Sequence, residues 1–400
     1  MNQKSEFDAS PSMLGYLYQV RFGLYLALKK LPEVDEPNQY NLSIETLDDV
    51  AFDQNGSPIE LIQAKYHQKR VGNITDRSSD IWKTIRVWID MLKKGKFELG
   101  KITLTLVTTQ SLPIDSIASY LSNTESRDID RAIKKMVEVC KEENKNNQSG
   151  YNAFSDLTGI EKQLFVSDIY IIGRNDDLLI LRSKLVRYGR QYTSEKTAEA
   201  FTDRIEGIWL QWCIEELSKT PTGIINLERL QNIVDTIKFE YTDNNLPTEF
   251  ANVFPDVIDI EQNCRNFIKQ LNIFNASSKM KERALRFYYR AFCQRSKWAK
   301  DGLLDPGELK NYDMRLREKW EEFEMFLEAD IEIESEEGKR KYSVNLYREC
   351  IQNGVIPIRK DFTEAYVSKG SYEILSDNLE IGWHPDYLEI LKESSNEDAA

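Results

Sequence analysis

An Asn-Gly pair, Asn55 and Gly56, is the feature that most restricts how this chain can fold. It stands between two β-type runs at residues 50–53 and 59–66, and Asn-Gly is the strongest short-range signal for a two-residue hairpin turn. A third β-type run lies just upstream, at residues 40–45. The turn fixes which residues of the two strands lie opposite each other, so it also decides which polar side chains can meet.

Helical patterns stand on both sides of these three runs. Residues 12–31 and 76–94 carry apolar side chains at the spacing of one helix face, and residues 101–108 alternate like a strand. The predicted order is therefore αβββαβ, within an α/β domain at residues 1–145. We expect a mixed α/β and then helical middle region at 152–245, after a polar linker, and a mainly helical C-terminal domain at 250–400.

The composition excludes several classes of site. The 400 residues include two histidines, His67 and His384, so zinc sites rich in histidine and HNH-type nuclease sites are excluded. Five cysteines stand apart with no CxxC pair, which argues against a zinc ribbon or a disulfide framework. No signal-peptide core and no long apolar run is present, so we expect a cytoplasmic protein with no membrane partner.

The hairpin brings acidic and basic side chains towards each other. Residues two apart on a strand share a face, so Gln63, Lys65 and His67 are expected to point the same way. Asp48 and Asp49 begin the preceding strand, which the turn folds back beside the far end of the next one. A carboxylate can therefore lie next to Gln63 and Lys65.

Such a group suits metal-dependent hydrolysis of a phosphodiester. Mg²⁺ (or Mn²⁺) prefers oxygen ligands, which Asp49, the side chain of Gln63 and the backbone carbonyl of Ala64 would supply. Lys65 would orient the water or stabilise charge on the phosphate. Three further residues could add contacts to the metal or its ligands: Asp48, Glu45 and Gln19. The alternative is an ordinary half-exposed hairpin with solvated polar residues.

Charge divides sharply along the first hundred residues. Residues 65–101 carry ten Lys and Arg against four Asp and Glu, whereas residues 1–64 carry four against ten. A basic surface beside an acidic metal pocket suits binding to the phosphates of double-stranded DNA, with little sequence preference. The residues expected to contact DNA are Lys69, Arg70, Lys83 and Arg86; the alternative is a solvated helix face.

Several short motifs in the first quarter of the chain resemble a known nuclease family. Gln63-Ala64-Lys65 resembles the Mrr-like branch of the PD-(D/E)XK nucleases, in which Gln replaces the usual acidic residue. Together with Gly15-Tyr16-Leu17-Tyr18-Gln19, Glu45-x-x-Asp48-Asp49 and Asp80-Ile81-Trp82-Lys83-Thr84, it resembles the double-stranded-DNA endonuclease domain of CD-NTase-associated antiphage effectors. The resemblance implies a restriction-endonuclease-like fold with Asp49, Gln63 and Lys65 as catalytic residues.

The C-terminal segment resembles a different group of proteins. Residues 365–375 and 381–387 are similar to the C-terminal signature of ABC three-component systems of the Lamassu type. This resemblance implies the effector nuclease subunit of an antiphage complex, with an SMC-like ATPase and a small third subunit as partners. It also implies that the ATPase complex restrains the effector, which acts after release and assembly into a homo-oligomer such as a tetramer.

A basic helix face at residues 279–298 admits two interpretations. Lys279, Arg283, Arg286, Arg290 and Lys297 share this face, which could contact DNA or an acidic partner, or could simply be solvated. For the whole chain, the main hypothesis is a metal-dependent endonuclease of double-stranded DNA. The rivals are a catalytically silent DNA-binding or scaffold subunit of an SMC-type complex, and a phosphoesterase acting on small nucleotides.

Overall fold

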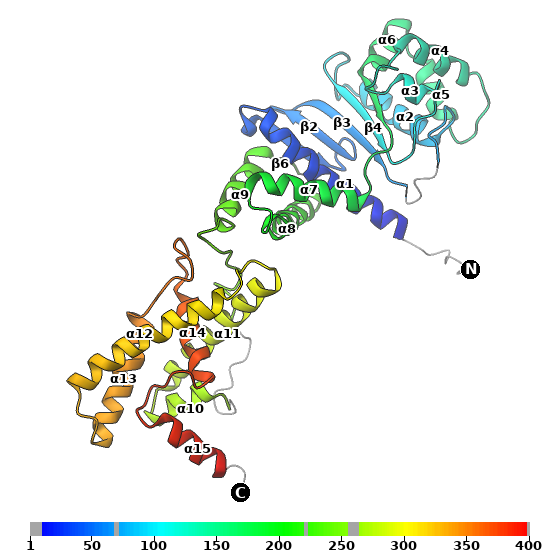
Figure 1. The fold of residues 1–400 in the computed structure, drawn as a ribbon. Helices are drawn as coiled ribbons and strands as arrows, with labels where there is room; N and C mark the ends of the chain where they lie inside the picture. The colour runs from blue at the N-terminus through cyan, green and yellow to red at the C-terminus, as the bar shows by residue number, and fades with distance from the viewer. Residues whose placement is uncertain (1–9, 68–71, 220–222, 255–263, 398–400) are drawn as a thin grey trace, which may run out of the picture. The chain divides into compact units, whose positions relative to one another are not determined.

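The computed structural model describes residues 10–67, 72–219, 223–254 and 264–397, and the chain forms two compact units. The first unit comprises residues 1–192 and 198–236, and the second comprises residues 193–197 and 237–400. All strands of the described residues belong to the first unit, whereas the described elements of the second are helices (Figure 1). The expected layout, an α/β N-terminal part followed by a mainly helical C-terminal part, is confirmed.

The first unit is built on a six-stranded mixed sheet in the order β5-β4-β3-β2-β1-β6. Neighbouring strands run antiparallel from β3 through β2 and β1 to β6, and β4 and β5 continue the sheet parallel to β3. The strands are β1 (Tyr40–Ile44), β2 (Val50–Gln54), β3 (Ser57–Lys65), β4 (Thr103–Thr108), β5 (Ile169–Ile172) and β6 (Ile225–Asn226).

The hairpin between β2 and β3 forms as the Asn-Gly pair predicts. Asn55 and Gly56 both have positive φ angles, 52° and 81°, as a type I′ turn requires. The turn pairs Gln54 with Ser57, and after one irregularity the register pairs Val50 with Ile62. The start of β2 therefore lies beside the end of β3.

Helices cover both faces of the sheet. Helix α2 (Ser79–Lys93) packs Ile85 and Trp88 into the same core as Ala51 of β2 and Leu61 of β3. Helix α1 (Ser10–Lys30) covers the other face. A Cβ on Gly23 would lie 3.4 Å from the Ile44 side chain, so glycine allows this close packing. The elements thus occur in the order αβββαβ.

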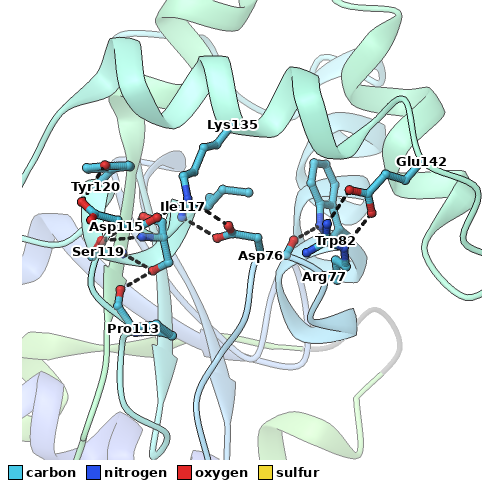
Figure 2. Close-up of polar contacts among 11 residues, drawn as sticks. Asp76, Arg77, Trp82, Pro113, Asp115, Ile117, Ser119, Tyr120, Lys135 and Glu142 are labelled. Atoms are coloured by element: carbon cyan, nitrogen blue, oxygen red, sulfur yellow. Dashed lines mark hydrogen bonds and ion pairs between the residues drawn. The ribbon is translucent and has the colours of Figure 1, made fainter.

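Polar contacts fix the loop that leads into α2 (Figure 2). The carboxylate of Asp76 accepts a hydrogen bond of 2.6 Å from the Ile117 N–H, and the Lys135 ammonium lies 3.5 Å from its other oxygen. The backbone carbonyl of Asp76 accepts a bond of 2.7 Å from the Trp82 indole. These contacts tie the start of α2 to the helices that follow β4.

The region at 152–245 does not form a separate middle unit, contrary to the expected three-part division. β5 extends the sheet at one edge and β6 at the other, so residues up to Thr236 belong mainly to the first unit. The remaining helices of this unit are α3 (Ile117–Tyr120), α4 (Ile129–Val139), α5 (Gln148–Ser155), α6 (Gly159–Asp168), α7 (Leu178–Tyr192), α8 (Ala198–Leu217) and most of α9 (Leu227–Glu240).

Helix α5 occupies part of the polar segment for which we expect a linker. A Cβ on Gly150 would lie 2.4 Å from the Trp82 carbonyl oxygen. Glycine at this position therefore serves the close approach of α5 to α2, not flexibility.

The second unit is a group of packed helices. A Cβ on Gly370 would lie 2.1 Å from the carbonyl oxygen of Phe287, so glycine is needed where α14 crosses α11. None of the helices in the described residues is both long and apolar enough to span a membrane. The helices of the unit are α10 (Asn266–Ile273), α11 (Ser278–Lys300), α12 (Glu308–Asp330), α13 (Glu336–Gln352), α14 (Ala365–Asp377) and α15 (Tyr387–Glu397).

Candidate functional site

The candidate site lies at the C-terminal end of β3, which β2 and β4 flank in the sheet. Leu61 of β3 packs in the core under α2, and side chains alternate along a strand. Gln63 and Lys65 therefore point to the same face of the sheet as Leu61. Gln63 is buried and Lys65 is half-buried, so the ammonium lies at the rim of this face.

Asp49 reaches this strand end from β2. Its Oδ2 accepts a hydrogen bond of 2.7 Å from the backbone N–H of Ala64, the residue between Gln63 and Lys65. Continuing the register that pairs Val50 with Ile62 sets Asp49 opposite Gln63, on the same face. The structure thus brings Asp49 to the Gln-Ala-Lys segment. The expected role of the Ala64 carbonyl as a metal ligand stays a prediction, because the contact shown is made by its N–H.

Asp48 points towards α2 and is held there. Its Oδ2 accepts a bond of 2.6 Å from the indole N–H of Trp88, and its Oδ1 accepts one of 3.0 Å from the Asp49 N–H. Burial raises the pKa of Asp48 to about 7, although the Trp88 bond lowers it. Both carboxylate oxygens thus have protein donors, which makes Asp49 the better candidate for a metal ligand.

Glu45 and Gln19 form the rim of the site on the side of α1. Glu45 has a positive φ of 55°, and its N–H donates to the Asp49 carbonyl across the turn between β1 and β2. Burial raises the pKa of Glu45 and the charge of Asp49 adds to this, whereas a hydrogen bond from Gln19 and the charge of Lys65 lower it. Five of the expected residues therefore interact electrostatically around one strand end.

The chemistry of this group suits a hard cation. Carboxylate and amide oxygens are the ligands that Mg²⁺ prefers. The Oε1 atom of Gln19 is buried and has no hydrogen-bond partner in the described part of the chain, as an oxygen set aside for a cation would be. No cluster of three or more His, Cys, Asp or Glu side chains suited to a metal occurs among the described residues, so the set depends on amide oxygens.

The remaining predicted residues lie elsewhere. Lys83 and Arg86 are exposed on the side of α2 that faces away from its buried stripe, and Lys69 and Arg70 fall outside the described residues. The Nε2 atom of His67 lies 2.7 Å from Oδ2 of Asp80, so this contact connects the segment after β3 to the start of α2.

The sequence interpretation missed the role of Trp88. The spacing of apolar residues along α2 predicts that Trp88 faces the core, and its ring does pack there. Its indole N–H also donates the hydrogen bond that holds Asp48. A buried tryptophan usually has a hydrogen-bond partner for its indole N–H, so a polar partner for Trp88 could have been predicted from its expected burial.

Comparison with known proteins bears on the second unit. Residues 267–391 match the model of C-terminal domain 7 of the ABC-three component (ABC-3C) systems. No match was found among curated proteins. The match supports the expected context, a component of a multi-subunit system with partner subunits, and it covers α11, α12, α13 and α14 completely.

Proposed function

We propose that the chain is the nuclease effector of an ABC-three component antiphage and anti-plasmid defence system of the Lamassu type. Its first unit would be a PD-(D/E)XK domain that cuts double-stranded DNA with Mg²⁺ or Mn²⁺. One observation carries the proposal: the Asp49 carboxylate is bonded to the N–H of Ala64, between Gln63 and Lys65 on one strand end. The αβββαβ order and the C-terminal family match support it.

In this proposal the residues divide the chemistry between them. Asp49 and the amide oxygen of Gln63 hold the metal, with Glu45 and Gln19 as further oxygen donors nearby. A bound divalent ion supplies Lewis acidity and lowers the pKa of water. The Lys65 ammonium, half-buried at the rim, stabilises the negative charge that develops on the phosphate. Exposed Lys83 and Arg86 contact phosphates, which carry no sequence information.

Plasmid cleavage tests the proposal directly. Purified protein is incubated with supercoiled plasmid and Mg²⁺, alone and together with its partner subunits. Asp49→Ala and Lys65→Ala should abolish cutting, whereas Lys134→Ala removes an exposed lysine outside both the site and the basic stretch at 65–101 and should leave it unchanged. Equal cutting by the wild type and both site variants would show that another group does the chemistry.

We also propose that the second unit binds an SMC-like ATPase and a small third subunit. In this arrangement the ATPase complex restrains the nuclease, which acts after release and homo-oligomerisation. Removal of residues 250–400 should abolish co-purification with these subunits. A truncated chain that still co-purifies would move the partner surface to the first unit.

A second candidate function is a catalytically silent DNA-binding or scaffold subunit. One observation favours it: the described residues hold no cluster of acidic, His or Cys side chains suited to a metal. DNA binding without cleavage, under every metal and partner condition, would select this candidate.

A further inference from the structure

A basic groove runs along α11 in the second unit. It consists of two cavities of about 350 Å³ each, and the two share Lys279, Arg283 and Phe287 in their walls. One cavity adds residues from α13 and α14, including Tyr347, Ile351 and Lys369. The groove can therefore hold an extended chain with at least two side chains in its cavities.

Apolar side chains line the groove together with the cations. Phe287 and Tyr347 are each less than a tenth exposed, and Met280 and Val344 lie in the same cavity. The Arg283 guanidinium carbon lies 5.3 Å from the centroid of the Phe287 ring. A ligand of this groove would therefore meet apolar surface as well as positive charge.

The close crossing of α14 and α11 places Lys369 in this groove. Because Gly370 has no Cβ, α14 approaches the backbone of α11 at Phe287. This packing places the Nζ atom of the neighbouring Lys369 5.6 Å from the centroid of the Phe287 ring. The Arg283 guanidinium contacts the same ring. Two cations share one aromatic ring as a consequence of helix packing.

Four cations of the groove have no counter-ion within the part of the chain that the structure describes, although one acidic side chain, Glu282, also lines the groove. No ion pair among those residues involves Lys279, Arg283, Arg348 or Lys369, whereas Arg286 pairs with Glu282. Burial lowers the pKa of Lys369, and repulsion by Arg283 lowers it further. An unpaired cluster of like charges is unfavourable, and it stands out in a chain whose net charge is −13. A bound anion would relieve the repulsion.

We propose that this groove binds an acidic segment of a partner subunit that also inserts an apolar side chain beside Phe287. The inference rests on the proposed membership of an ABC-three component system, and it names the surface used there. Buried aromatic and arginine side chains together are typical of the centre of a protein interface. Phosphate contacts with duplex DNA do not need an apolar cavity, so a protein segment fits the groove better.

Co-purification with the proposed ATPase and third subunit tests the groove. The full-length double variant Arg283→Glu/Lys369→Glu should reduce the complex at least tenfold, because it places acidic groups against an acidic segment. Lys300→Glu makes the same kind of change at an exposed position of α11 outside both cavities, and it should leave the complex intact.

Milder substitutions separate binding from folding. Arg283→Gln/Lys369→Met removes both charges and keeps the alkyl stems, and thermal unfolding shows whether the chain is still folded. This variant should weaken the complex and reduce its sensitivity to salt between about 0.1 M and about 0.5 M, because surface charges are screened over that range.

The outcomes distinguish this inference from the function on which it rests. If the wild-type chain and both double variants form the complex equally well, the groove is not the partner surface, and the proposed system membership is unaffected. Failure of the wild-type chain to bind either subunit would overturn the proposed system membership, and the inference with it. Variants that keep the complex but bind duplex DNA less tightly would instead assign the groove to nucleic acid.

Discussion

The candidate site of the first unit and the basic groove of the second unit differ in how their charged side chains are balanced. At the candidate site of the first unit, internal donors satisfy the carboxylates: Trp88 and a backbone N–H hold Asp48, and the Ala64 N–H holds Asp49. In the groove of the second unit, Arg283 and Lys369 share a ring with no counter-ion among the described residues. The candidate site fixes its aspartates with internal donors, whereas the two cations of the groove are left without a partner of opposite charge within the described chain.

The largest expected effect concerns the first arrangement. Asp49→Asn keeps an oxygen that can accept the Ala64 N–H but removes the negative charge. If the charge holds a metal, Mg²⁺-dependent plasmid cleavage should fall about 10²–10³-fold while the unfolding midpoint stays close to that of the wild type.

Gln63→Glu is the matched test, because it adds a carboxylate at the position where Gln replaces the acidic residue usual among PD-(D/E)XK nucleases. This variant should retain cleavage. An active Asp49→Asn enzyme would show that the hydrogen bond to Ala64, and not the charge, is what Asp49 provides.

The next effect tests how the groove is assembled. Gly370→Ala forces a Cβ against the Phe287 carbonyl, so α14 must move away from α11. We expect a loss of about 2–3 kcal/mol in unfolding free energy, measured with denaturant, and a weaker partner complex because Lys369 moves with the helix.

Gly207 provides the control, because it lies within α8 and a Cβ added there would have no neighbouring atom within 4 Å. Gly207→Ala should therefore stabilise the chain by about 0.5–1 kcal/mol through helix propensity. If both substitutions behaved alike, the close crossing of α14 and α11 would not explain the groove.

The sequence predicts those features of the two surfaces that depend on residues close together in the chain. The Asn-Gly turn and strand alternation are local, and they are enough to bring Asp49 to the strand that carries Gln63 and Lys65. The bond from Trp88 to Asp48 joins residues 40 apart, and the role of Gly370 depends on the backbone of a helix some eighty residues earlier. Hydrophobic periodicity shows that a residue is buried but does not identify its partner.

A buried acid in the second unit gives a pH-dependent effect. Glu373 is fully buried in α14, where the Tyr347 hydroxyl donates a bond of 2.8 Å to its Oε1, and burial raises its pKa to about 8. The folded chain therefore keeps a proton that the unfolded chain releases above its own pKa. Stability should fall as the pH rises from about 4.5 to about 8.

Glu373→Gln tests this linkage, because Gln keeps an acceptor for Tyr347 and does not ionise. Its stability relative to the wild type should be close to unchanged near pH 4.5 and should increase by about 4 kcal/mol towards pH 8, as measured by denaturant unfolding. A difference between the two chains that is independent of pH would mean that Glu373 is not the titrating group.

The smallest effect tests the internal support of the candidate site. Trp88→Phe keeps an aromatic ring under α2 but removes the donor to Asp48, so the buried carboxylate loses its side-chain partner. The pKa of Asp48 should rise further above its value of about 7. Because only the charged form needs the donor, the substitution should cost about 1–2 kcal/mol more at pH 8 than at pH 5.

A double-mutant cycle with Asp48→Asn separates this bond from the volume that the smaller ring leaves empty. Both backgrounds share the packing loss, so it cancels, and the pH-dependent part should disappear when Asp48 is replaced. If that part persisted with Asn at position 48, the carboxylate stabilised by Trp88 would have to be another one. The candidate site would then lack the internal support that distinguishes it from the basic groove.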